Sequence, residues 1–335
     1  MTSRPPIAPV PAAEHRPLWS VMIPAHDPGP HLRTALESVL AQDPGPAAMQ
    51  VTVVDDGSTE DLAAVARECA GDRVDVVRHA RNLGHVRTFN ACLERSRGRF
   101  VHLLHADDAV LPGFYDRLAA GLDRDGVGAA FCRYTAVNGA GKPLKVSDLE
   151  RVGPGVLPGW LRKIAVGQRL QPPCIAVRRE VYERLGGFDT RIRSYGEDWE
   201  MWTRIAAHYD VWFEPEPLAL YRVEGPSLSH SAVRSGDNVR QLVQVIELNR
   251  DVLPHDEAEE LTRAALRETA VTAIRRARRL AEGGEYRAAS RQLAAGLAAD
   301  RSRPVLARLG RALLGLAALR VRYALRPLSR RRGRG

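Results

Sequence analysis

Two adjacent carboxylates, Asp107 and Asp108, follow directly on an apolar run that begins at Val101. Like charges at the end of a buried strand repel one another, and a carboxylate is costly to bury without a partner. A divalent cation bound to substrate phosphates is the usual solution. The alternative is that the two acids cap a helix that starts near Leu111. His105 could be a third metal ligand, a neighbour of the ligands or a packed core imidazole.

Two further acidic clusters favour a ligand-binding or catalytic role for these acids over a role as helix caps. Asp55 and Asp56 end another apolar run, can accept hydrogen bonds from a base or a ribose, and precede Gly57, which permits a tight turn. Glu197 and Asp198 open a helical pattern, and a carboxylate there can serve as a general base. Each pair could instead cap a helix, although a single acid would suffice for that.

Apolar runs bounded by turn residues predict the strands that carry these clusters. Ser58 or Thr59 is expected to cap the helix after the second strand, with Glu60 and Asp61 in its first turn. The predicted strands are 19–24, 51–54, 74–77, 100–104 and about 174–177. The predicted helices are 31–41, 86–93 and 199–207.

Strands that alternate with helices predict an α/β fold with a mostly parallel sheet covered on both faces. Ligands of such sheets bind at the carboxyl ends of the strands. The first two acidic clusters fall at such ends. Near the third cluster, Arg191, Arg193 and Tyr195 have the composition of a binding rim.

The chain divides into four predicted regions. Residues 1–17 hold five prolines and no apolar stretch, so we expect a disordered leader rather than a signal peptide. The α/β domain is expected over 18–235, an all-helical region over 236–326 and a basic tail over 327–335. The expected helices of the third region are 237–250, 256–281, 286–299 and 304–325, of which the middle two loosely suggest one tetratricopeptide-like pair.

The charge is concentrated at one end of the chain. The net charge of the 335 residues is +9, but residues 301–335 hold 11 arginines and no acid, which leaves 38 basic and 40 acidic residues elsewhere, a net of −2. This distribution argues against a nucleic-acid partner for the main domain. The basic helix 304–325 could lie on an anionic membrane or dock on the preceding helices, and its apolar run, 312–319, is too short to span a bilayer.

The remaining bulk properties indicate a cytoplasmic protein, with peripheral contact at the inner face of the plasma membrane as an option. No run of 18 or more apolar residues is present. The four cysteines are widely spaced, which favours reduced core thiols over disulfides or zinc ligands.

Read together, six short motifs resemble those of a known family in both order and spacing. The chain resembles a bacterial family 2 glycosyltransferase with a GT-A fold, over roughly residues 18–225, with the helical region as an all-α C-terminal appendage. The motifs are Ile23–Asp27, Val54–Ser58, Asn82–Gly84, Leu104–Asp108, Gly186–Asp189 and Gly196–Asp198.

The resemblance implies an inverting, non-processive hexosyltransferase that uses a nucleotide-diphosphate sugar, with a UDP-sugar favoured, and a divalent cation, Mg²⁺ or Mn²⁺. The acceptor could be a glycan, a lipid-linked glycan, a natural product or a peptide. By position, the catalytic residues are Asp198 as base and Glu197 as the next candidate, and the metal ligands are Asp107, Asp108 and His105. The nucleotide-sugar residues are Pro24, His26, Asp27, Asp55, Asp56, Asn82, Gly84, Arg87 and Asp107.

The sequence departs from the family pattern in three places. His105 replaces the first acid of the DxD motif, and His26-Asp27 stands where Tyr-Asn is commoner. No Gln-x-x-Arg-Trp motif follows Asp198, which, with the lack of an apolar span, argues against a processive polysaccharide synthase.

Other functions are weighed against this one. A dinucleotide-dependent oxidoreductase would need a G-x-G-x-x-G loop after the first strand, where prolines stand instead. A nucleotidyltransferase would need a Gly-rich basic loop there. A degenerate transferase that serves as a binding scaffold is the non-enzyme alternative, and the retention of Asp107, Asp108 and Asp198 argues against it.

Overall fold

The computed structural model describes residues 3–223 and 228–313 and divides the chain into two compact units. The first unit covers 1–164, 168–193 and 197–225, and the second covers 165–167, 194–196 and 226–335. The last and longest segment of the second unit begins at 226, about ten residues before the expected start of the helical region at 236. Its first helix, α8, was not predicted.

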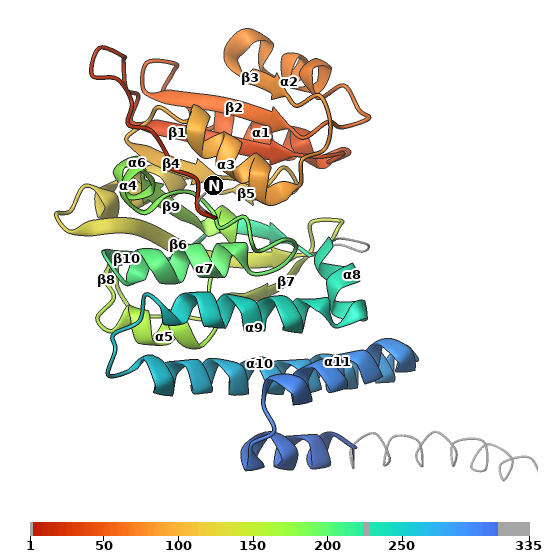
Figure 1. Cartoon of the computed structure of the whole chain (residues 1–335). Coiled ribbons are helices and arrows are strands. Elements are labelled where there is room, and N and C mark those ends of the chain that lie inside the picture. Colours follow the sequence, from red (N-terminus) through yellow and green to blue (C-terminus); the bar gives the residue numbers. More distant parts are fainter. Residues whose placement is uncertain (1–2, 224–227, 314–335) are drawn as a thin grey trace, which may run out of the picture. The chain divides into compact units, whose positions relative to one another are not determined.

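The first unit is built on one twisted sheet whose strands lie in the order β3-β2-β1-β4-β9-β6-β10-β5, with β7 paired to β6 and β8 to β10 (Figure 1). The strands are β1 Trp19–Ala25, β2 Met49–Asp55, β3 Asp75–Arg78, β4 Phe100–Leu103, β5 Ala109–Val110, β6 Val127–Val137, β7 Pro143–Val146, β8 Gly155–Val156, β9 Ile175–Arg178 and β10 Asp210–Arg222.

The helices of this unit connect and cover the strands. The helix α1 shows why: its buried residues Leu32, Ala35, Leu36 and Val39 recur at helical spacing and form one apolar face. The helices are α1 His31–Leu40, α2 Leu62–Ala70, α3 His85–Arg95, α4 Phe114–Leu122, α5 Trp160–Val166, α6 Arg179–Leu185 and α7 Glu197–Ala206.

The sheet is mixed rather than parallel throughout. The strands β3, β2, β1 and β4 are all parallel, as the sequence predicts, and β6 runs parallel to β10. Between these two groups, β9 pairs antiparallel with both β4 and β6. Helical crossovers join β1, β2, β3 and β4, and all but β3 are buried throughout. The strand β9 is joined to its neighbours by long-range pairing that local patterning does not reveal.

The cap of α2 differs from the prediction. Asp61 is the N-cap, and its side chain accepts a hydrogen bond from the backbone N–H of Ala64 at 3.0 Å. Ser58 and Thr59 do not cap α2, because both hydroxyls are engaged by Asp27, two residues after β1. The predicted reduced state of the thiols agrees with the structure, in which all four cysteines are free and three are buried.

The prediction of a disordered leader is wrong. Residues 3–9 lie against the first unit: Ile7 is only 2% exposed, and the carbonyls of Ser3 and Pro5 accept hydrogen bonds from Thr190 and Gly187. The Arg4 guanidinium lies 3.3 Å from Asp189 and 2.8 Å from Glu200, two carboxylates that are almost fully buried. The prolines favour an extended segment, and these long-range contacts fix it in place.

We expect Arg4→Met to lower the free energy of unfolding by about 2 kcal/mol, because it removes a cation from two buried carboxylates. As a control, Arg33→Met breaks the exposed pair with Glu68 and should cost less than about 1 kcal/mol. Chemical denaturation of the full chain measures both. Equal losses in the two variants would mean that the leader contributes no specific stability.

The second unit is helical, with α8 Leu228–Ser235, α9 Asp237–Arg250, α10 Ala258–Glu282 and α11 Tyr286–Ala299. Small side chains allow its helices to approach closely: a Cβ on Gly296 would lie 2.8 Å from the Cβ of Ala273. A further helical segment, 303–313, packs Val305, Leu309 and Ala312 on the cluster that contains Ala270. The described part of the predicted helix 304–325 therefore docks on its own unit, and the rest of that helix and the basic tail, 327–335, lie outside the described residues.

Within residues 3–223 and 228–313, we find no helix with the length and apolar character needed to cross a bilayer.

Candidate active site

The carboxyl ends of three parallel strands meet at one edge of the sheet (Figure 1). Ala25 at the end of β1 lies beside Asp55 at the end of β2, and Met22 lies beside Leu103 of β4. The segments that follow these ends carry Asp27, the second carboxylate of the 55–56 pair and the 105–108 motif. The predicted placement of the first two acidic clusters at strand ends is therefore confirmed.

Asp108 is a buried carboxylate with one oxygen engaged and one not. Its Oδ1 accepts a hydrogen bond from the backbone N–H of Arg222 at 2.7 Å, and its Oδ2 is buried without a hydrogen-bond partner. Burial, reinforced by the charge of Asp107, raises the pKa of Asp108 well above its usual range. The acids do not cap a helix, because β5 follows them and α4 begins only at Phe114.

His105, Asp107 and Asp108 form a group that fits a divalent cation. One ligand atom from each lies within 4.8 Å of the others. The Oδ2 of Asp108 and the Nε2 of His105 are both buried, and neither has a hydrogen-bond partner. The imidazole ring stacks on Phe89 at a centroid distance of 5.3 Å, which fixes its orientation. Carboxylate oxygens with an imidazole nitrogen suit Mn²⁺, and the oxygens alone suit Mg²⁺.

The predicted nucleotide residues Asp55 and Asp56 are both buried, and their oxygens are engaged differently. The Oδ1 of Asp55 accepts the N–H of Ser58 at 2.8 Å, while its Oδ2 lies 3.5 Å from Arg78. Directly after Asp56, Gly57 has a φ of +71°, and a Cβ there would lie 2.7 Å from the backbone of Arg81. This confirms that the turn after the second acid requires glycine.

Asp56 supports the loop before α3. Its two oxygens accept the backbone N–H groups of Leu83 at 2.8 Å and Gly84 at 3.0 Å, and His79 lies 3.1 Å away. Burial would raise the pKa of Asp56, but these hydrogen bonds outweigh it and the pKa is lowered. The carboxylate is therefore ionised and committed to the loop.

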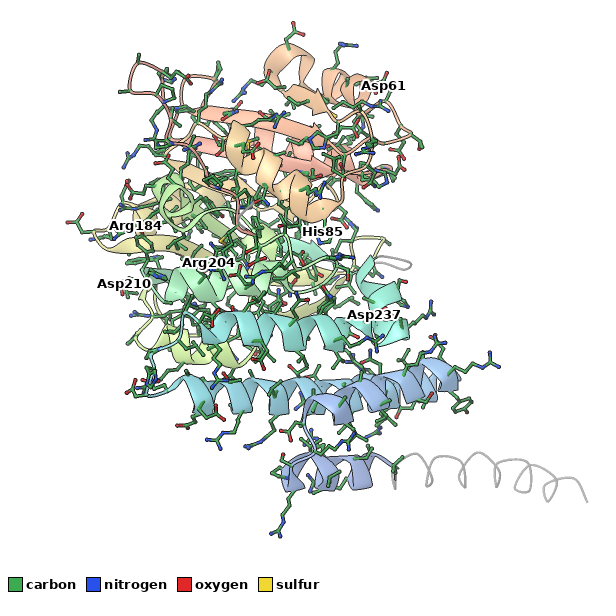
Figure 2. The ribbon with its side chains drawn as sticks, in the orientation of Figure 1. Asp61, His85, Arg184, Arg204, Asp210 and Asp237 are labelled. Atoms are coloured by element: carbon green, nitrogen blue, oxygen red, sulfur yellow. The ribbon has the colours of Figure 1, made fainter. Side chains whose placement is uncertain are left out.

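We expect Asp56→Ala to lower the free energy of unfolding by about 2–3 kcal/mol, because the N–H of Leu83 loses its acceptor and the N–H of Gly84 keeps only the side chain of Asn82. Asp61→Ala, which removes only the N-cap of α2 (Asp61 is labelled in Figure 2), should cost about 1 kcal/mol. Urea denaturation compares the two variants. A smaller loss for Asp56→Ala than for Asp61→Ala would contradict the supporting role.

The segment after β1 holds Asp27 in an unusual conformation. Its φ is +45°, the one positive value among non-glycine residues in the described ranges, and such values concentrate at functional sites. The N–H and hydroxyl of Thr59 both donate to its Oδ1, at 2.7 and 2.9 Å, and the hydrogen bond from the backbone N–H leads the effects that lower the pKa of Asp27. His26 beside it is exposed, and Pro24 is buried inside β1.

The loop before α3 carries the other predicted nucleotide residues. The Oδ1 of Asn82 accepts the N–H of Gly84 at 2.9 Å, and Gly84 has a φ of +90° as it leads into the helix. Arg87 is exposed in the first turn of α3. Asn82 therefore shapes the loop that Asp56 holds from the other side.

Glu197 and Asp198 begin α7, and their environments differ. The Oδ1 of Asp198 accepts the N–H of Trp199 at 2.8 Å, and the side-chain amide of Gln168 donates to Oδ2. Burial, together with the charge of Glu197, raises the pKa of Asp198 to about 7. Glu197 lies 3.2 Å from His85, and its pKa is lowered because this interaction outweighs burial.

The three acidic clusters converge. Besides burial, the charges of Glu197, Asp198 and Asp56 act on the pKa of His85, and those of Asp107 and Glu197 act on that of His105. Burial, with contributions from Asp108 and Asp198, raises the pKa of Cys174 to about 12. Direct contacts connect the three clusters: Asp56 accepts the N–H of Gly84, the next residue His85 pairs with Glu197, and Phe89 packs against both His85 and His105.

Two residues of the predicted binding rim, Arg191 and Tyr195, contact other side chains of the protein. The Arg191 side chain pairs with Asp189 at 2.6 Å. In the second unit, the Tyr195 hydroxyl accepts a hydrogen bond from Arg276 of α10 at 2.9 Å, and the guanidinium lies 5.7 Å from the centre of the same ring. These contacts give Arg191 and Tyr195 structural roles.

Four residues that contact the candidate site were not predicted. Arg222 and Gln168 hold the two key carboxylates, Phe89 stacks on His105, and His85 pairs with Glu197. Only His85 carries a local signal, because it follows the motif 82–84 directly.

A sheet of this order, with acidic strand ends and a carboxylate-led helix, defines the GT-A class of nucleotide-diphospho-sugar transferases. Residues 20–186 match the model of Glycosyl transferase family 2. The chain is 30% identical over 228 residues to an uncharacterized protein of Mycobacterium tuberculosis, covering 62% of this chain and 67% of that one. It spans only 26% and 42% of two other curated relatives. The chain belongs to glycosyltransferase family 2.

Solved structures agree on the fold. The mannosyltransferase PcManGT of Pyrobaculum calidifontis, in complex with GDP-Man and Mn²⁺, has a TM-score of 0.56 at 22% identity and covers 93% of this chain and 88% of its own. TarS 1–349 of S. aureus, in complex with UDP-GlcNAc, has a TM-score of 0.54 at 16% identity, with 85% and 93% covered. The predicted fold class and enzyme class are confirmed.

Proposed function

We propose that this chain transfers a sugar from a nucleotide-diphosphate sugar to an acceptor hydroxyl with inversion of the anomeric centre. The observation that carries the proposal is the placement of the buried Asp198 carboxyl at the start of α7, where the N–H of Trp199 and the side-chain amide of Gln168 hold it and burial raises its pKa to about 7. A general base works best when its pKa is near the operating pH. Its neighbour Glu197 has a lowered pKa, and two adjacent carboxyls with diverging proton affinities are typical of acid–base sites.

The reaction is a single displacement. The acceptor oxygen forms its bond to the anomeric carbon as its proton passes to an oxygen of Asp198. The bond from that carbon to the diphosphate oxygen breaks on the opposite face, and its electron pair leaves with the nucleoside diphosphate. Gln168 and the N–H of Trp199 hold the carboxylate in one orientation while it accepts the proton.

The donor is expected at the carboxyl ends of β1, β2 and β4. Asp55 is the better candidate than Asp56 for the nucleobase, because both oxygens of Asp56 already accept backbone hydrogen bonds. Of the other predicted nucleotide residues, His26, Asp27 and Arg87 are exposed and so accessible to a donor. A UDP-sugar is favoured, and the UDP-GlcNAc complex of TarS is consistent with this choice. GDP-Man, bound by PcManGT, is the alternative.

Asp107 and Asp108 would hold a divalent cation, with His105 as a further ligand. When bound, Mg²⁺ or Mn²⁺ offsets the charge that develops on the departing diphosphate. The Mn²⁺ in the PcManGT complex supports a metal of this kind.

Turnover assays test the proposal. Release of nucleoside diphosphate from UDP-, GDP- and dTDP-sugars would be measured with glycan, lipid-linked, natural-product and peptide acceptors. We expect one donor to be consumed with formation of a β- or α-linked product of inverted configuration. Donor binding without turnover across the acceptor panel would instead favour the degenerate scaffold.

The basic residues near the end of the sequence bear on the kind of acceptor. We propose a cytoplasmic protein that contacts an anionic membrane through residues 320–335, which would bring the site to a lipid-linked acceptor. Each basic residue near such a surface adds about 1 kcal/mol. Co-sedimentation with phosphatidylserine vesicles would compare the full chain with a variant in which the arginines at 330–332 and 334 are glutamine. Equal, salt-insensitive binding would reject the proposal and favour a soluble acceptor.

A further inference from the structure

His85 forms a largely buried ion pair that the transfer mechanism does not yet use. It is the first residue of α3, and Figure 2 labels it at that end of the helix. Its Nε2 lies 3.2 Å from Oε1 of Glu197, and the two side chains are 21% and 13% exposed. The other carboxylate oxygen, Oε2, is buried without a hydrogen-bond partner. His85 is therefore the main partner of a buried charge next to Asp198.

Aromatic packing fixes the position of His85. Its ring meets Phe89 edge-on at a centroid distance of 5.6 Å. Phe89 in turn packs against Phe188 at 5.4 Å and stacks on His105 at 5.3 Å. Because Phe89 is buried between these rings, the imidazole has little freedom to turn away from Glu197.

The charges around His85 favour its protonated form. Burial lowers its pKa, but the hydrogen bond and charge of Glu197, with help from Asp198 and Asp56, outweigh it, so the pKa is raised. His105 is the nearby group of like charge, and its own pKa is lowered chiefly by burial. An imidazolium at this place keeps Glu197 ionised in a site where burial alone would protonate it.

We infer that His85 is a positioning residue for the transfer, which holds Glu197 as an ionised carboxylate and so leaves Asp198 as the carboxyl that takes the acceptor proton. The inference rests on the proposed function for the identity of the base. It assigns the two neighbouring acids different roles, one structural and electrostatic and one catalytic. Without His85, the two carboxyls would share one titration.

Histidine side-chain NMR tests the pair without any substrate. The ¹⁵N-labelled full chain would be titrated from pH 5 to 9 as wild type and as Glu197→Gln, with His85→Gln assigning the signal. We expect the pKa of His85 to lie above the ordinary histidine value in the wild type and to fall by about one unit or more in Glu197→Gln. An unchanged His85 pKa in a folded Glu197→Gln variant would overturn the inference.

Kinetics provide the second arm. His85→Gln keeps a neutral hydrogen-bond donor, so the fold should persist, but it removes the charge. The assay uses the nucleotide sugar that the turnover assays identify as the donor. In His85→Gln, the acid limb of the kcat–pH profile should shift by about half a pH unit or more from that of the wild type, with little change in KM for this donor. The control His255→Gln, at an exposed site in the second unit, should leave the profile in place.

An acid limb of His85→Gln that coincides with that of the wild type would overturn the positioning role. The two arms also separate this inference from the proposed function. If Asp198→Asn retains turnover while the NMR result is as expected, the proposed base is wrong and the ion pair stands. If Asp198→Asn is inactive and the NMR result is negative, only the role of His85 fails.

Discussion

Asp198→Asn is expected to lower kcat by about 10²–10⁴-fold while leaving donor affinity within about twofold. The amide keeps the shape of the side chain, and its oxygen can still accept the N–H of Trp199, whereas the amide of Gln168 must turn to present its oxygen to the new NH2 group; the amide cannot accept the acceptor proton. Steady-state turnover and calorimetric titration with the donor measure the two effects. The matched control is Asp123→Asn, which changes an exposed acid on the same unit. Near-wild-type turnover of Asp198→Asn would move the base to Glu197.

The same variant should gain stability at high pH. Because the pKa of Asp198 is raised from 3.8 to about 7, the folded protein holds a proton that the unfolded chain releases, and stability falls as the pH rises through this range. Asp198→Asn lacks this penalty. Its melting temperature should exceed that of the wild type at pH 8, and the difference should shrink towards pH 4. If Asp198→Asn were less stable than the wild type at pH 8, the Asp198 carboxylate would not be destabilised by burial.

The second large effect is expected at the metal site. Asp108→Asn should abolish Mn²⁺ binding and reduce activity by at least about 10²-fold, because it removes a buried charged ligand next to the diphosphate. Burial raises the pKa of Asp108, and a bound cation would lower it again by favouring the ionised carboxylate. Mn²⁺ and protons therefore compete for this carboxylate, so the affinity for Mn²⁺ should fall as the pH is lowered.

Electron paramagnetic resonance of free Mn²⁺ measures this binding on the full chain without substrate. The control Asp116→Asn, on the exposed face of α4, should bind as the wild type does. His105→Gln should weaken binding less than Asp108→Asn, since the carboxylates remain. Full wild-type activity in excess EDTA would contradict the metal role and point to His105 and nearby arginines as the groups that neutralise the diphosphate.

Local patterning predicted the part of the fold that local contacts build. The apolar runs that form β1, β2 and β4 end where the acidic motifs begin, and the structure has the strands within one or two residues of the predicted bounds. The helices α9 and α11 also match their predicted ranges. In each case one short window of sequence holds both the buried residues and the residues that end the element.

The features that the sequence did not predict depend on distant partners. The leader is ordered because Arg4 meets acids about 190 residues later in the chain. The strand β9 lies between β4 and β6, although its own residues do not specify an antiparallel neighbour. Asp61 caps α2 because Asp27 occupies the two hydroxyls that were expected to do so.

Motifs in the sequence located the residues of the candidate site but did not give the role of each residue. The residue types and spacing located the acids, yet they did not distinguish Asp55 from Asp56 or Glu197 from Asp198. Those distinctions come from backbone N–H groups and from His85, which are set by the fold. A pair of adjacent acids acquires two roles only when each meets a different environment.

The most direct test of the central claim is a thermal-shift measurement of the full chain with a panel of UDP-, GDP- and dTDP-sugars, each with Mn²⁺ and with EDTA. A ligand at 100 times its Kd stabilises the folded state by about 2.7 kcal/mol, which corresponds to a rise of about 4 °C for a protein of this size. We predict such a rise for at least one donor in Mn²⁺, and its loss in EDTA and in Asp108→Asn. No shift with any nucleotide sugar, at concentrations up to the millimolar range, would contradict the account.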